Sequence, residues 1–263
     1  PHTVPMESRL MWPPQTQPSD HVLLERFQVG AWLARGGMSD VYLGTDRDGL
    51  HASCVLKIAN SERSSEWLQQ EATLLNILRH RHIVSLIDHG MDSRGRVVLA
   101  LEHIDGPSFG ELLQRGTWKI RDLLTWMKQL CDALTVAHRH GIVHGDLKPA
   151  NVCIRSIDKS CCLLDFGLHA PANIRRVVAE KNAVLGSPRF IAPEHIRGEI
   201  IDHRADIYGL GILLFRSLTG AYPFQGHTKI ETLAAHLFQP IPTFKERATK
   251  PVLGRELEEV VRI

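Results

Sequence analysis

One short stretch, residues 144–151, carries three side chains whose types suit phosphoryl transfer. It reads His-Gly-Asp-Leu-Lys-Pro-Ala-Asn and places an acid, a cation and an amide at Asp146, Lys148 and Asn151. Phosphoryl transfer needs a group that orients the attacking hydroxyl, a positive charge beside the moving phosphate and an oxygen ligand for magnesium. Pro149 favours an extended backbone at Lys148, and therefore a loop that displays these side chains. The stretch is a candidate phosphate-handling loop that needs partners elsewhere in the chain.

Partners for this loop occur in a fixed order along the sequence. Lys57 ends a β-prone run, and Glu71 lies on the helix predicted to follow it. Asp165 begins an Asp-Phe-Gly tripeptide after the loop, and an Ala-Pro-Glu tripeptide ends at Glu194. With this set of motifs the sequence resembles a eukaryotic-like serine/threonine protein kinase over roughly residues 25–263. Two stretches, 33–42 and 202–211, resemble bacterial members of that family.

The resemblance implies a site for ATP and Mg²⁺. Lys57 would hold the α- and β-phosphates and would be steadied by an ion pair with Glu71. Asn151 and Asp165 would hold the magnesium ion. These roles are expectations that come from the family and not from the spacing alone.

The resemblance also implies how the acceptor hydroxyl is handled. Asp146 would orient the hydroxyl or accept its proton, and Lys148 would contact the transferring phosphate. Ser187, within a Gly-Ser-Pro tripeptide, stands where such kinases carry a threonine beside the catalytic aspartate. A lysine two residues after that aspartate resembles the serine/threonine class, so the implied partners are protein substrates with Ser or Thr hydroxyls.

The adenine slot is placed by aligning the predicted strands with the family pattern. It would consist of apolar side chains above and below the ring and of hinge backbone groups that hydrogen-bond to its edge. The implied residues are Leu101 as gatekeeper, Glu102 to Ile104 as the hinge, Val41 and Val55 as the roof, and Cys153 as the floor.

The glycine-rich loop departs from the family pattern. Against G-x-G-x-x-G-x-V, the positions read Ala34, Gly36, Ser39 and Val41. The backbone approaches a phosphate most easily where there is no Cβ, and Ala and Ser are the smallest replacements for Gly. We therefore expect weaker ATP affinity and not a loss of binding.

A second departure is Gly145, which stands where most protein kinases have the arginine that binds a phosphorylated activation loop. Residues 169–185 contain no Ser, Thr or Tyr. The hypothesis is that activity does not depend on phosphorylation of this loop. Arg175 and Arg176 are a candidate contact for an acidic partner, although an exposed basic pair is more often a solvated feature.

The predicted fold class is α+β with the two lobes of a protein kinase. Residues 1–24 are predicted to be a flexible leader, 25–104 the N-lobe and 105–263 the C-lobe. The N-lobe is predicted to hold five antiparallel strands, over 27–33, 41–45, 53–58, 83–88 and 96–103, and one helix capped by Ser64 or Ser65.

The C-lobe is predicted to be mainly helical. It would begin with a long amphipathic helix over 120–137, continue through a short strand pair and include a helix from just after Asp206 to about 219. The sequence ends inside what resembles an earlier helix of this lobe, so we expect its C-terminal helices, and an arginine partner for Glu194, to be missing.

Composition limits which ligands and which cellular compartment are expected for this chain. The formal net charge of +2 on 263 residues gives no reason to expect binding to nucleic acid. The most apolar stretch, 207–218, is too short to span a bilayer, so no membrane segment is expected within this chain. Five cysteines without a CxxC pair suit a reducing, cytoplasmic compartment, and the histidines lack zinc-ligand spacing. Oligomeric state, and an anchor outside this chain, stay open.

Two alternatives to an active protein kinase remain open. A small-molecule kinase of the aminoglycoside phosphotransferase type also carries His-Gly-Asp, but Lys148-Pro149, Asp-Phe-Gly and residues 186–194, which seat a peptide in protein kinases, argue against it. A pseudokinase that serves as a scaffold usually lacks the lysine or one aspartate, whereas Lys57, Asp146 and Asp165 are all present here.

Overall fold

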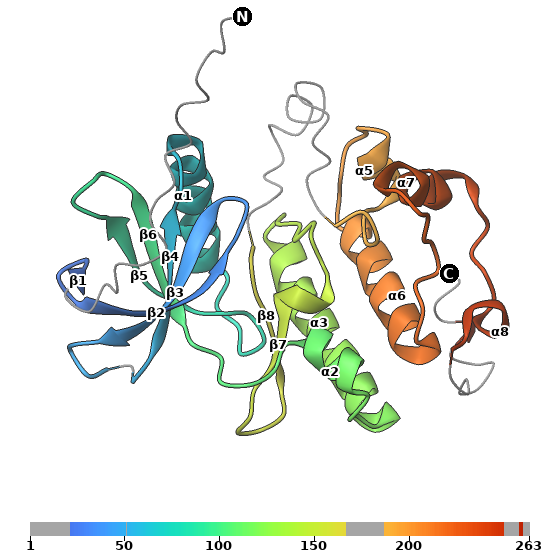
Figure 1. The fold of residues 1–263 in the computed structure, drawn as a ribbon, viewed down its shortest axis with the longest axis horizontal. Helices are drawn as coiled ribbons and strands as arrows, with labels where there is room; N and C mark the ends of the chain where they lie inside the picture. The colour runs from blue at the N-terminus through green and yellow to red at the C-terminus, as the bar shows by residue number, and fades with distance from the viewer. Residues whose placement is uncertain (1–21, 51, 167–186, 250–257, 260–263) are drawn as a thin grey trace, which may run out of the picture.

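The computed structural model describes residues 22–50, 52–166, 187–249 and 258–259. Within these ranges the chain forms two lobes, one built on a sheet and the other mainly helical (Figure 1). The division agrees with the predicted α+β class. None of the helices in the described ranges has the length and apolar character needed to cross a bilayer.

The N-lobe sheet is antiparallel throughout, in the order β1-β2-β3-β4-β6-β5. Helix α1 packs on strands β4, β5 and β6. The elements of this lobe are β1 (Val22–Leu23), β2 (Phe27–Arg35), β3 (Ser39–Asp46), β4 (Cys54–Ala59), α1 (Glu62–Ile77), β5 (Leu86–Met91) and β6 (Val97–Glu102).

The prediction of five strands was wrong by one, because β1 also pairs with β2. A two-residue strand is too short to show alternation, so no periodic signal marked it, and it lies within the range predicted as a leader. The prediction of a strand over 83–88 was displaced from the observed β5. Ile83 and Val84 are apolar because they are buried against the C-lobe, where Val84 N donates to Leu163 O at 3.0 Å.

Strand β4 shows how alternation sets the position of Lys57. Cys54, Leu56 and Ile58 are buried in one apolar cluster on the outer face of the sheet. Successive side chains of a strand point to opposite faces, so Val55 and Lys57 share the other face, toward the C-lobe. The lysine is therefore directed by the same pattern that fills the core behind it.

Helix α1 begins earlier than predicted. Its N-cap is Ser61, whose hydroxyl accepts a hydrogen bond from Ser64 N at 3.2 Å, and not Ser64 or Ser65. The side chain of Ser64 is used instead to donate to Asn60 Oδ1 at 2.8 Å. Several nearby serines can cap a helix, and only the packing of the first turn selects among them. Glu71 lies on the buried face of this helix.

The C-lobe surrounds the residue 144–151 loop with helices. Its elements are α2 (Phe109–Arg115), α3 (Ile120–Arg139), the short 3-10 helix η1 (Pro149–Asn151), β7 (Val152–Ile154), β8 (Cys161–Leu163), α5 (Pro193–Ile196), α6 (Arg204–Thr219), α7 (Lys229–Phe238) and α8 (Phe244–Arg247). The long helix and the strand pair confirm the predictions. Helix α6 begins at Arg204, so the prediction that Asp206 precedes it was wrong.

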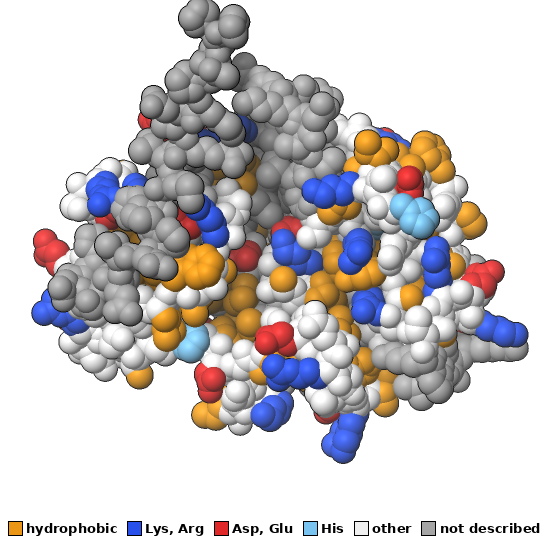
Figure 2. Space-filling model, viewed as in Figure 1, with side chains coloured by type: hydrophobic (Ala, Val, Ile, Leu, Met, Phe, Trp, Pro, Cys, Tyr) orange, Lys and Arg blue, Asp and Glu red, His pale blue; other side chains and the backbone are white. Residues whose placement is uncertain are grey.

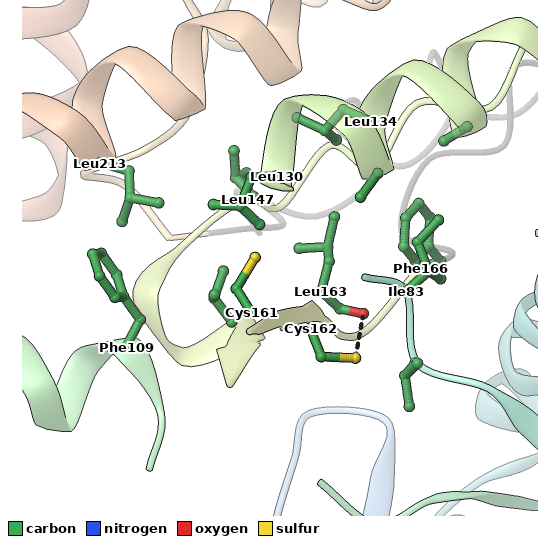
Figure 3. Close-up of a cluster of buried hydrophobic side chains, with 14 of the residues drawn as sticks. Ile83, Phe109, Leu130, Leu134, Leu147, Cys161, Cys162, Leu163, Phe166 and Leu213 are labelled. Atoms are coloured by element: carbon green, nitrogen blue, oxygen red, sulfur yellow. Dashed lines mark hydrogen bonds between the residues drawn. The ribbon is translucent and has the colours of Figure 1, made fainter. Parts of the chain in front are cut away.

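A continuous apolar core runs beneath the loop. Leu147, from the loop itself, packs in one cluster with Leu130 of α3 and Leu213 of α6 (Figure 3). Ile83 of the N-lobe and Phe166 belong to the same cluster. The loop therefore rests on the core of the C-lobe, and that core reaches the N-lobe.

Among the aromatic side chains of the core, Phe109 is expected to contribute strongly to the free energy of unfolding. Phe109 is fully buried and contacts the Trp126 ring edge-on, with centroids 5.7 Å apart. Phe109→Ala should lower the free energy of unfolding by about 3–5 kcal/mol because it leaves a cavity. Phe238 is 81% exposed, so Phe238→Ala is the matched control and should change little. Urea denaturation measures both, and equal effects of the two substitutions would contradict this description of the core.

Candidate active site

A cavity of about 690 Å³ lies between the two lobes. Figure 2 shows the hollow from one side, with apolar side chains inside it. Fifteen of the residues singled out from the sequence line it: Ala34, Gly36, Ser39, Val41, Val55, Lys57, Glu71, Leu101, Glu102, Ile104, Asp146, Lys148, Cys153, Asp165 and Ser187. Asn151 does not line the cavity but is buried beside Asp146.

Lys57 connects three elements at the back of the cavity. Its Nζ lies 2.7 Å from Glu71 Oε1 on α1 and 2.5 Å from Asp165 Oδ1 in the C-lobe. Burial by itself would lower the pKa of Lys57, but the Asp165 and Glu71 carboxylates outweigh it and raise that pKa. Burial acts to raise the pKa of Asp165, and the attraction of Lys57 reverses this effect, so the pKa of Asp165 is lowered. Both groups are therefore charged at neutral pH.

The residue 144–151 loop brings its three polar side chains together. Lys148 Nζ contacts Asp146 Oδ2. Asn151 Nδ2 donates to the Asp146 backbone oxygen at 2.9 Å and to Asp146 Oδ2 at 3.3 Å. Since both bonds use the amide nitrogen of Asn151, its amide oxygen keeps its acceptor capacity.

Asp165 is held in an uncommon backbone conformation. Its φ is +57°, in the left-handed region that costs energy for residues other than glycine. The surrounding contacts hold it there: His144 Nε2 is hydrogen-bonded to Leu164 O at 2.8 Å, and the His144 ring contacts Phe166 edge-on at 4.8 Å. Contacts of the neighbouring residues Leu164 and Phe166 therefore keep Asp165 in a backbone conformation that is unfavourable by itself.

Asp206 is a site residue whose role the sequence reasoning missed. It is fully buried and accepts hydrogen bonds from His144 N at 2.9 Å, Gly145 N at 2.7 Å and His138 Nε2 at 2.7 Å. Burial acts to raise the pKa of Asp206, but these donors and the nearby His144 outweigh burial, so the pKa is lowered. The sequence does show an acidic residue next to an apolar run, but the prediction used Asp206 only to mark where the helix begins.

Gly145 fits the backbone that Asp206 imposes. Its φ is +72°, which only glycine adopts without strain. Because glycine has no Cβ, the loop can turn over the Asp206 carboxylate without backbone strain at position 145.

The roof and the hinge of the cavity each contain a polar interaction within the protein. Gly36 N donates to Ser39 O at 2.8 Å, so the degenerate glycine loop still forms a tight turn. Glu102 lines the cavity, but its carboxylate is paired with Arg155 at 2.5 Å. His103 of the predicted hinge and Phe166 of the Asp-Phe-Gly motif also line the cavity. Lining residues that were not given a role from the sequence include Trp67, Leu68, Val84, Ala150 and Leu164. Several of these are apolar and gave no chemical signal in the sequence.

A family model described as the protein kinase domain matches residues 27–259 of the chain. The chain belongs to the protein kinase family. This assignment agrees with the geometry, because the lysine, the two aspartates and the asparagine of the family motifs come together here between two lobes.

Curated bacterial relatives are similar to this family member along most of its length. It is 31% identical over 250 residues to the serine/threonine-protein kinase PknB of Mycolicibacterium smegmatis, covering 91% of this chain and 39% of the relative. It is 33% identical over 248 residues to the serine/threonine-protein kinase pkn2 of Myxococcus xanthus, covering 90% and 29%. The chain thus spans less than half the length of either relative.

Some predictions about this kinase-family chain fall on residues that the structure does not describe. Arg175 and Arg176, and the stretch without hydroxyl side chains, lie within 167–186, outside the described residues. The predicted leader lies mostly within 1–21, which is also outside them. These remain predictions.

The role of Asp206 can be tested through its charge. Its folded-state pKa is lowered, so the carboxylate stabilises the fold above its ordinary pKa of about 3.9, and this contribution is lost as pH falls through the lower folded-state value. Asp206→Asn should lower the free energy of unfolding by about 1–3 kcal/mol at pH 7, because buried donors lose acceptors. The difference from the parent protein should shrink below about pH 4.

Urea denaturation at several pH values measures this difference. Asp132 is exposed on α3, so Asp132→Asn removes the same charge and should leave stability nearly unchanged. If the two variants behave alike at pH 7, Asp206 does not hold the loop.

Proposed function

We propose that this chain transfers the terminal phosphoryl group of ATP, with Mg²⁺, to Ser and Thr hydroxyls of proteins. The observation that carries the proposal is the meeting of Lys57, Asp146, Lys148 and Asp165 at one cavity between the lobes. The printed names of the bacterial relatives support the Ser/Thr class. A cytoplasmic site of action fits the five cysteines, all of which are free thiols.

The side chains present fit a magnesium nucleotide. Asn151 donates through its amide nitrogen, which leaves the amide oxygen as a hard ligand, and Asp165 keeps a second carboxylate oxygen besides the one on Lys57. Lys57 would hold the α- and β-phosphates, while Glu71 keeps the ammonium group of Lys57 in place. When bound, magnesium would neutralise the charge that develops on the phosphates.

Asp146 and Lys148 suit the acceptor side of the reaction. Asp146 is 5% exposed and is held by Asn151, so its carboxylate has a defined direction toward an incoming hydroxyl. Lys148 would move from Asp146 to the transferring phosphate, and Ser187 lines the same cavity. Orientation and charge stabilisation of this kind account for most of the catalysis in phosphoryl transfer.

Independence from activation-loop phosphorylation is part of the proposal. Gly145 brings no guanidinium to receive a phosphate, and the Asp206 carboxylate holds the backbone of the 144–151 loop. The lack of an arginine at position 145 favours an active site that does not require a phosphorylated activation loop.

The two alternatives receive less support. A scaffold without activity has no need to keep Lys57, Asp146 and Asp165 around one cavity, and a small-molecule kinase has no need for a peptide-seating segment such as residues 186–194. Both stay open to the experiments that follow.

Substitution of Asp146 is the direct test of the proposed chemistry. Asp146→Asn should reduce transfer of radiolabelled phosphate from ATP to a generic protein substrate by about 10²–10⁴-fold, because the orienting carboxylate is lost. The melting temperature should stay within a few degrees of the parent protein, and Mg-ATP should still bind. Asp132→Asn, on the exposed side of α3, is the charge-matched control and should be fully active. Parent protein that transfers no phosphate would favour the scaffold.

Phosphatase treatment tests the regulation. Preparations with and without prior treatment should show equal kcat and KM for a peptide substrate, because no arginine at position 145 reads a loop phosphate. Mass spectrometry of residues 165–194 identifies any phosphate that was removed. A preparation that loses activity together with a phosphate in this range would overturn the hypothesis.

A further inference from the structure

Two arginine side chains share one aromatic ring in the C-lobe. The guanidinium carbon of Arg189 lies 4.8 Å from the centroid of the Tyr222 ring, and that of Arg216 lies 5.1 Å from it. Phe190 contacts the same ring edge-on, with centroids 5.6 Å apart. Tyr222 therefore holds two cations near one point, although their like charges repel each other.

Neither arginine is paired with a carboxylate among the residues that the structure describes. Arg26, Arg96 and Arg155 each have an Asp or Glu partner within 2.7 Å. The ion pairs of the described ranges do not include Arg189 or Arg216. A guanidinium that stacks on a ring keeps its N–H donors in its own plane, where they can bind a carboxylate.

Arg189 and Arg216 each belong to a segment that also contributes to the active site. Arg189 lies in a turn closed by Phe190 N, which donates to Ser187 O at 2.9 Å, and Ser187 lines the cavity together with Asp146. Arg216 lies on α6, the helix whose Asp206 holds the loop that carries Asp146. Both cations therefore belong to segments that also contribute to the active site.

The face of the C-lobe that Figure 2 shows carries an uneven distribution of charge. Figure 2 shows Lys and Arg side chains gathered on the C-lobe side of the cleft, with fewer acidic side chains among them. The formal charge of the whole sequence is only +2, so this excess is local and not a property of the protein as a whole. A local excess of one sign favours a ligand of the opposite sign at that place.

We propose that Arg189 and Arg216, stacked on Tyr222, form a subsite for an acidic side chain of the protein substrate. A substrate carboxylate bound there accepts hydrogen bonds from the two guanidinium groups and offsets part of their charge, while a neighbouring hydroxyl reaches Asp146. The inference rests on the proposed function and adds a substrate class to it, namely acidic Ser- or Thr-containing segments.

Peptide kinetics test the subsite. The substrates are peptides with one Ser, flanked by Glu, Gln or Lys at otherwise identical positions. The parent protein should show a kcat/KM for the Glu peptide that exceeds the value for the Lys peptide by about tenfold or more, the effect of one charge-assisted hydrogen bond. In Arg189→Glu/Arg216→Glu the preference should be lost or reversed through the KM of the peptide, while the KM of ATP stays unchanged.

Matched variants separate the subsite from general electrostatics. Arg197 is exposed a few residues after Arg189, so Arg197→Glu makes the same change in charge and should keep the preference. Tyr222→Phe keeps the stacked ring and should keep the preference, whereas Tyr222→Leu should weaken it. An equal loss in Arg197→Glu would show a general charge effect and would overturn the proposal, as would an unchanged preference in the double variant.

Binding measurements keep this test independent of catalysis. Fluorescence anisotropy of the labelled Glu peptide, in the presence of Mg-ADP, should show tighter binding to the parent protein than to the double variant. If no peptide is phosphorylated but this difference is seen, the proposed function fails and the acidic subsite stands. Equal binding to both proteins would overturn the subsite even if the parent protein is an active kinase.

Discussion

The bond between Lys57 and two carboxylates is the interaction on which the arrangement of this protein depends. It joins β4 and α1 of one lobe to Asp165 of the other. Buried ion pairs contribute little net stability, because desolvation offsets the attraction, but removal of one member leaves an unpaired charge at high cost. The value of the bond is therefore geometric: it permits few relative positions of the strand, the helix and the C-lobe.

The C-lobe supports the opposite side of the cavity by different means. Asp206 binds the backbone of the 144–151 loop from below, and Leu147 of the same loop is packed in the apolar core. Hydrogen bonds to a buried, charged acceptor are strong and directional, while core packing resists displacement. Together they hold Asp146 in place from within the C-lobe.

Substrate selection is a separate property of the same lobe. The turn that begins at Ser187 connects the cavity to Arg189, and Tyr222 brings Arg216 of α6 to the same place. The elements that position catalytic groups thus also position two cations on the adjoining surface. In the proposed subsite, an acidic segment would be recognised by residues other than those proposed to handle ATP.

The sequence by itself determined the family, the lobes and the chemically distinctive residues, because motif chemistry and the alternation within strands are local properties. Lys57, Glu71, Asp146, Asn151 and Asp165 could be named in this way. Tertiary structure alone decided which serine caps α1, that β1 joins the sheet, that Asp206 faces inward beneath the loop, and that Arg189 and Arg216 meet at Tyr222. These outcomes depend on contacts between residues far apart in the chain, and no local pattern encodes which partners will meet.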